Sequence, residues 1–87
     1  MGKLKSSKSF DKDIGNLPPN IKKLLEKQLG FLMDDPFHPS LKTEKIDKKR
    51  GIWAARVNIK YRFTFTMVGD VYFLRRVGDH DKVLKNC

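Results

Sequence analysis

The sequence predicts an α+β fold in which an N-terminal hairpin of two helices packs on one face of an antiparallel β-sheet. Two observations lead to this prediction. Apolar residues recur with helical spacing up to about residue 33, and from about residue 52 they alternate with polar residues, as they do along strands. The 87 residues leave room for one modest core, so we expect a single domain over residues 1–87.

The first expected helix spans Lys8 to Leu17. Phe10, Ile14 and Leu17 fall at positions i, i+4 and i+7, and Ser7 can cap the first turn. Two prolines then interrupt the chain, and a proline is well suited to the first turn of a new helix. Because the link is short, we expect the two helices to form an antiparallel hairpin.

The second expected helix follows the prolines and ends at Asp34-Asp35-Pro36. Its residues form one apolar stripe, which contains Ile21, Leu24, Leu25, Gln28, Leu29, Leu32 and Met33. Charged residues lie mostly off this stripe, as is typical of a helix that covers a core. The partners that we expect for the stripe are Trp53, Ala55, Phe63 and Phe65.

Three strands are expected after the helices, over Ile52–Asn58, Tyr61–Val68 and Val71–Val77. Along the middle strand, large apolar side chains alternate with arginine and threonine, which predicts one buried and one open face. Gly69-Asp70 is a turn signal between the last two strands. Shorter patterns predict a strand within Leu41–Ile46 and an edge strand at Lys3–Ser6.

Positive charge is concentrated in the second half of the chain. Nineteen Lys and Arg residues oppose ten Asp and Glu residues, for a net charge of +9. Eight of the cations lie between Lys42 and Arg62, with only two carboxylates among them. This indicates a polyanionic partner, either a nucleic acid or an acidic protein; the alternative is a surface that only keeps the protein soluble.

Strand parity gathers several arginines on the open face of the sheet. Arg56 and Arg62 share this face, and they lie directly opposite each other if the turn between their strands centres on Ile59. A two-residue turn at Gly69-Asp70 would pair Thr64 with Arg75. Such a basic face is suited to phosphate, because the arginine fork binds two phosphate oxygens. The alternative is an ordinary solvated sheet face.

One histidine is a candidate for proton transfer. His80 follows the last strand at the end nearest Arg62, and a histidine there can exchange protons near neutral pH; the alternative is a histidine that is merely exposed. No group of carboxylates, histidines or cysteines has the spacing of a metal site. Any phosphodiester chemistry here is therefore expected to need no metal, and no cofactor is expected.

The sequence also favours a cytoplasmic protein with no membrane association. No apolar run approaches the roughly 20 residues that span a bilayer. The first ten residues lack the apolar stretch of a secretory signal. Cys87 is the single cysteine, so no internal disulfide can form.

Three segments together resemble a known family. They read KSFDKDIGNLPPNIKKLLEKQL, HPSLKTEKIDKKRGIWAARVNIKYRFTF and GDVYFLRRVGDHDKVLKN. Their order and spacing are similar to those of the RelE/ParE superfamily of type II toxin–antitoxin systems, and the resemblance covers nearly the whole chain. It implies two helices on an antiparallel sheet, and a toxin that cleaves mRNA, often on the ribosome. It also implies a cognate antitoxin that holds the toxin inactive.

The resemblance implies a role for individual residues. His80 matches the proton-transferring histidine, Arg62 matches an arginine that stabilises charge, and Arg56 matches a position held by basic residues or histidine. In the expected reaction the 2'-hydroxyl attacks the neighbouring phosphorus. The residues expected to bind RNA are Lys42, Lys45, Lys48, Lys49, Arg50, Lys60 and Arg75.

Two departures from the family pattern leave alternatives open. Ser40 stands where some histidine-containing members have a glutamate base, and Leu84 stands where an aromatic residue is usual. The general base is thus unidentified, and a catalytically weak nucleic-acid-binding protein is one alternative. A ParE-like inhibitor of DNA gyrase is another, although that branch typically lacks a histidine like His80.

Overall fold

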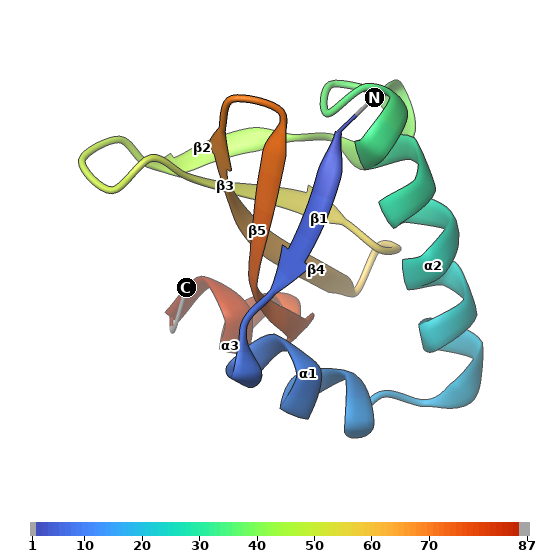
Figure 1. Ribbon diagram of the computed structural model, residues 1–87. Coiled ribbons are helices and arrows are strands. Elements are labelled where there is room, and N and C mark those ends of the chain that lie inside the picture. Colours follow the sequence, from blue (N-terminus) through green and yellow to red (C-terminus); the bar gives the residue numbers. More distant parts are fainter. Residues whose placement is uncertain (1, 86–87) are drawn as a thin grey trace.

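The computed structural model describes residues 2–85, so Cys87 lies outside the described residues. In chain order its elements are β1 (Lys3–Ser6), α1 (Lys8–Gly15), α2 (Pro19–Asp34), the 3₁₀ turn η1 (Pro39–Leu41), β2 (Glu44–Asp47), β3 (Ile52–Arg56), β4 (Tyr61–Val68), β5 (Val71–Asp79) and α3 (His80–Lys85). Figure 1 shows α1 crossing one end of the sheet and α2 running along its side. None of the helices in this part of the chain has both the length and the apolar character to cross a membrane.

The sheet has five strands in the order β1-β5-β4-β3-β2. β1 runs parallel to β5, and the other neighbouring pairs are antiparallel. The predicted α+β class is therefore confirmed, with one parallel edge strand added to the antiparallel sheet. A parallel neighbour requires a long connection, and here both helices and three strands intervene between β1 and β5.

The two N-terminal helices begin and end at the expected signals. The hydroxyl of Ser7 accepts a hydrogen bond from the Phe10 N–H at 3.0 Å, which caps α1. α2 begins at Pro19 and ends before Asp35, whose backbone is extended ahead of Pro36. The prediction that the two helices lie antiparallel was wrong, because they diverge from their short link rather than lying side by side along their lengths (Figure 1).

The core lies between these helices and one face of the sheet. Leu25 is 2% exposed and Phe63 is fully buried, and both belong to one cluster that joins α1, α2, β3, β4 and β5. The predicted packing of helix on sheet is thus confirmed for these residues. The prediction was wrong for Leu24, which is 37% exposed on the solvent side of α2.

The strand predictions hold best at the centre of the sheet. β4 has the predicted bounds, whereas β3 ends two residues early because Val57 and Asn58 both donate to the Tyr61 carbonyl in the turn. The segment expected as a strand at 41–46 divides between η1 and β2. β5 continues to Asp79, and the following residues form α3, which the sequence did not predict.

Candidate functional site

Two arginines lie opposite each other where β3 ends and β4 begins. The register pairs Arg56 with Arg62, as predicted from the sequence. Ala55 and Phe63, which flank them, point into the core, so both arginines point to the other side of the sheet. We call this side, which carries Ala54, Arg56, Arg62 and Thr64, the arginine face.

The charges of this pair are not compensated. The Nε atom of each guanidinium is buried and has no hydrogen-bond partner among residues 2–85. Like charges directly opposite across two strands are destabilising, and a buried donor without a partner costs about 1–3 kcal/mol, or more when it is charged. An oxyanion such as phosphate would supply the missing acceptors and the missing negative charge.

A buried glutamine holds the end of β3 in place. The side chain of Gln28 in α2 donates to the carbonyl of Arg56 at 2.7 Å and to the carbonyl of Ser40 at 3.0 Å. It is therefore hydrogen-bonded at a position where the helical stripe otherwise presents apolar groups. The sequence placed Gln28 on the stripe, and its contact with Arg56 became visible only in the fold.

His80 is anchored beside the arginine pair. Its backbone N–H donates to the Lys60 carbonyl at 2.9 Å, which ties the start of α3 to the turn before Arg62. Gly78, two residues earlier, stands directly opposite Arg62. The imidazole is partly exposed, and its Nδ1 lies 3.4 Å from a carboxylate oxygen of Asp81. The structure thus brings the predicted histidine and the two predicted arginines to one end of the sheet.

A β-bulge changes the predicted position of the third arginine. The prediction that Thr64 pairs with Arg75 was wrong, because Thr64 pairs with Arg76 and the next residue, Phe65, pairs with Leu74. Arg75 is therefore the additional residue of the bulge. Its carbonyl accepts a hydrogen bond from the Ser7 hydroxyl at 2.9 Å.

Arg76, unlike the two arginines opposite each other, has a carboxylate partner. Asp13 in α1 accepts from the Arg76 guanidinium at 2.7 Å and from the Val77 N–H at 3.2 Å. This hydrogen bond raises the pKa of Arg76 above its ordinary value. Asp13 therefore neutralises one arginine beside Thr64 and leaves the charges of Arg56 and Arg62 in place.

One carboxylate on the arginine face had no predicted role. Glu44 pairs with Ala54, which pairs with Thr64, so its side chain shares the face of Arg56. No ion pair joins Glu44 to Arg56 within the described part of the chain. The sequence could not reveal this position because it depends on the register of β2. Between residues 2 and 85, no three His, Cys, Asp or Glu side chains are grouped so that they could hold a metal ion.

The predicted RNA-binding lysines lie in several places. Lys48 and Lys49 are exposed in the β2–β3 turn, which projects from the body of the molecule (Figure 1). Lys42 is exposed just after η1 in a left-handed conformation, with φ at 49°. Lys45 pairs with Trp53 and so lies on the side of the sheet opposite the arginine face. The predicted cations therefore do not form one continuous patch on the arginine face.

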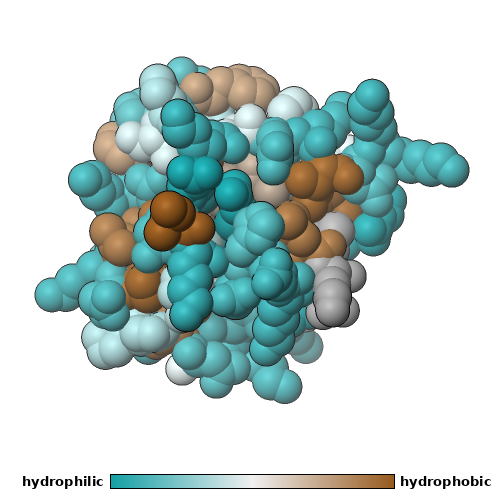
Figure 2. Space-filling view, turned by 180° about the vertical axis from the view of Figure 1, so that it is seen from behind, coloured by the Kyte–Doolittle hydropathy of each residue, from teal (hydrophilic) through white to brown (hydrophobic). Residues whose placement is uncertain are grey.

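The remaining predicted cations occupy turns. Arg50 lies 2.7 Å from the Asp47 carboxylate, and its hydrogen bonds lower the pKa of Asp47. Lys60 is exposed in the β3–β4 turn, with its ammonium 5.9 Å from the centre of the Tyr61 ring. Seen from behind, hydrophilic residues cover most of the surface and hydrophobic residues form separate patches (Figure 2).

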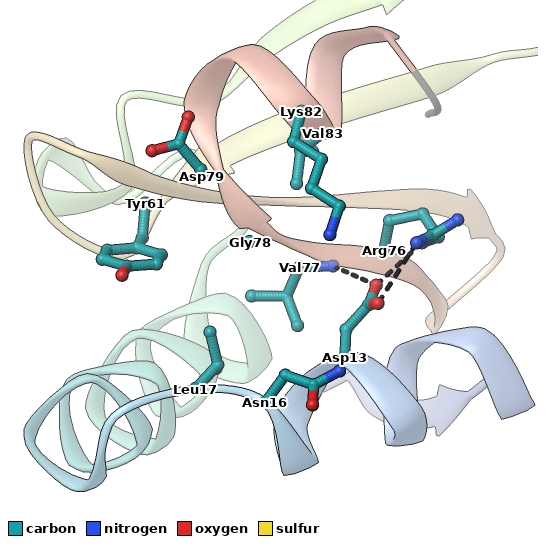
Figure 3. A pocket seen from close by; sticks show the side chains of 10 residues that line it. All are labelled: Asp13, Asn16, Leu17, Tyr61, Arg76, Val77, Gly78, Asp79, Lys82 and Val83. Carbon is teal, nitrogen blue, oxygen red and sulfur yellow. Dashed lines mark hydrogen bonds and ion pairs between the residues drawn. The ribbon is translucent and has the colours of Figure 1, made fainter.

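A cavity lies at the free edge of β5, where β1 no longer pairs with it. Its volume is about 180 Å³, and α1, β4, β5 and α3 all contribute to its walls. Figure 3 shows Asp13 at one side of it, bonded to Arg76 and Val77, with Lys82 and Asp79 on the other side. Asp13 and Arg76 form an ion pair, so the charge of Arg76 is already neutralised. The cavity is therefore a weaker candidate for binding an anion than the uncompensated arginine pair.

Comparison with solved structures identifies the fold. A metal-bound toxin from Helicobacter pylori is similar with a TM-score of 0.78 and 26% identity, over 95% of this chain and 99% of that chain. YafQ from E. coli strain BL21(DE3) is similar with a TM-score of 0.76 and 16% identity, over 94% and 97%. A chain of the RelB-RelE antitoxin-toxin complex from Methanococcus jannaschii is similar with a TM-score of 0.75 and 21% identity, over 93% and 95%.

The chain thus has the fold of the RelE/ParE toxins, as its sequence motifs predicted. No protein-family model matches the chain, and no curated protein matches it.

Proposed function

We propose that this protein is the toxin of a type II toxin–antitoxin pair and a metal-independent endoribonuclease that cleaves mRNA on the ribosome. The observation that carries the proposal is the pair Arg56 and Arg62, whose buried Nε atoms have no acceptor among the described residues. A folded protein keeps such uncompensated charge most readily where a ligand or a transition state supplies the opposite charge. In phosphodiester cleavage, that charge develops on the phosphorane oxygens.

The proposed reaction needs one proton acceptor and one proton donor. The 2'-oxygen bonds to phosphorus while its proton passes to a base, and the P–O5' bond breaks while the 5'-oxygen takes up a proton. The products are a 2',3'-cyclic phosphate and a 5'-hydroxyl. We assign His80 as the donor, since it is anchored beside Arg62, and Glu44 as the acceptor, since it shares the arginine face.

The proposal also names the partners of the protein and its compartment. Messenger RNA is the substrate, the ribosome presents it, and an antitoxin covers the basic surface and suppresses cleavage in the cytoplasm. Two similar structures support an antitoxin partner: the RelB-RelE complex, and the E. coli DinJ-YafQ complex with a TM-score of 0.76 and 14% identity. The net charge of +9 favours both an RNA substrate and an acidic partner.

The direct test adds purified protein to ribosomes that translate a defined mRNA and maps cuts by primer extension. We expect cuts within the translated region, and we expect none from a variant that combines Arg56→Met with Arg62→Met. A parallel assay measures DNA supercoiling by gyrase. Inhibition of gyrase together with intact mRNA would contradict the proposal and favour the gyrase-inhibitor alternative.

A further inference from the structure

Four aromatic rings gather where the link after α2 meets β3. Phe31 and His38 stack with their centres 4.1 Å apart and their planes within 7° of parallel. Phe37 meets Trp53 edge-on at 5.3 Å. We call Phe31, Phe37, His38 and Trp53 the aromatic cluster.

The aromatic cluster is open to solvent on one side. Phe37 is 56% exposed, which is high for so large an apolar side chain, and the other three rings are only partly buried. Two flexible cations lie near the rings: the ammonium of Lys45 is 5.1 Å from the centre of Trp53, and that of Lys27 is 6.0 Å from Phe31. The described part of the chain therefore displays aromatic faces flanked by positive charge.

We propose that the aromatic cluster is a stacking site for an unpaired base of single-stranded RNA. Bases stack on aromatic side chains without regard to sequence, and nearby cations bind the backbone phosphates. The ammonium of Lys45 lies over the face of Trp53 on which a base would stack. The flexible stem of Lys45 lets this ammonium move to an adjacent phosphate when the base binds. This inference rests on the proposed function, because it takes RNA as the ligand.

The position of the cluster relative to the arginine face defines the path of the RNA. Trp53 and Arg56 are on the same strand but on opposite sides of the sheet. Only β2 separates β3 from this edge of the sheet. An RNA strand bound at both places therefore passes around the β2 edge, where Lys42 is exposed. The charge beside the rings favours this polyanion over an apolar protein segment.

Trp53 is the single tryptophan of the chain, so its fluorescence reports on this site alone. The probe is a single-stranded RNA 10-mer with 2'-O-methyl groups, which binds but cannot undergo attack by the 2'-oxygen. An abasic oligomer of the same length carries the phosphates without the bases. We expect the 10-mer to quench Trp53 and the abasic oligomer to leave its emission unchanged.

Substitution of Phe37 separates stacking from charge. We expect Phe37→Ala to weaken binding of the 10-mer by about 5- to 100-fold, the scale for one stacked base, and Phe37→Tyr to retain it. The matched control is Val68→Ala, which removes an apolar side chain that is 65% exposed at the end of β4, and it should bind as the unaltered protein does.

Three results would overturn the inference. Equal quenching by the abasic oligomer would mean that phosphates alone are bound. Unchanged binding of the 10-mer by Phe37→Ala would show that the Phe37 ring does not contact the RNA. Weaker antitoxin binding by Phe37→Ala, with unchanged RNA binding, would show that the cluster binds the protein partner. Any of these, found while the unaltered protein still cuts mRNA, would reject the stacking site and leave the proposed function standing.

Discussion

Arg62 lies opposite a second arginine, and its buried Nε has no hydrogen-bond partner among residues 2–85. We expect Arg62→Met to lower the cleavage rate by about 10²–10³-fold, because it removes charge stabilisation from the transition state. The same change should raise the melting temperature by roughly 4–8 °C for each 1 kcal/mol of relieved repulsion and desolvation. Methionine keeps most of the apolar stem of the side chain.

Single-turnover cleavage and thermal unfolding measure the two effects of Arg62→Met. Lys23→Met removes an exposed charge from α2 and serves as the matched control, with both quantities unchanged. A fully active Arg62→Met variant would show that Arg62 does not contribute to cleavage. A less stable variant would show that the charge of Arg62 is compensated in the protein alone.

The two proposed proton-transfer residues can be tested in the same way. We expect His80→Ala to slow cleavage by about 10²–10⁴-fold, the scale for a positioned acid or base, and Glu44→Gln to have an effect of similar size. Asp81→Asn changes the exposed neighbour of His80 and should alter the rate little. If Glu44→Gln cleaves at the full rate, the base lies elsewhere; if His80→Ala does, the mechanism is wrong.

At the level of the elements, α2 and β4 each place side chains in the core. Leu25→Ala or Phe63→Ala should lower the free energy of unfolding by about 2–5 kcal/mol, since each removes a side chain that is almost fully buried. Leu24→Ala changes the neighbouring exposed leucine and should cost much less. Urea unfolding monitored by circular dichroism compares the three variants, and equal losses for Leu24 and Leu25 would contradict the packing described above.

The β2–β3 turn should respond to acid through Asp47. Hydrogen bonds from Arg50 hold the pKa of Asp47 below its ordinary value of 3.8, so the folded turn favours the carboxylate. The stabilisation is therefore complete above pH 3.8 and is lost as the pH falls through the lowered pKa of the folded state. The protection of the turn amides from exchange, measured relative to the intrinsic exchange rate at each pH, should fall below about pH 4. In Asp47→Asn this pH-dependent fall should be absent. An identical acid response in both proteins would exclude Asp47 as its cause.

Features that depend on residues close together in the sequence could be predicted, and features that depend on contacts between distant segments could not. Arg56 and Arg62 could be paired from sequence because a tight turn separates their strands. The position of Arg75 could not be predicted, because it depends on a β-bulge. Beside this bulge, Asp13 accepts a hydrogen bond from the Val77 N–H, and Asp13 lies more than sixty positions earlier in the chain. α3 has too few residues to show a clear helical period. The position of Glu44 could not be predicted, because it depends on the residue at which β2 begins to pair with β3.

On the scale of the whole molecule, one end of the sheet collects the groups that the proposed chemistry needs. The arginine pair, His80 and Glu44 come from β2, β3, β4 and the start of α3, and Gln28 links β3 to the helical layer. The net charge of +9 adds attraction for RNA from any direction and makes binding sensitive to salt. An antitoxin that covers this end would block the substrate and supply the acceptors that the arginines lack.

The chemistry of the cut ends tests this account most directly. The mRNA fragments made by the purified protein on ribosomes are analysed for their terminal groups, with His80→Ala as the reference. The account predicts a 2',3'-cyclic phosphate on one fragment and a 5'-hydroxyl on the other, formed far more slowly by His80→Ala. A 5'-phosphate at the cut, or unchanged cleavage by His80→Ala, would contradict it.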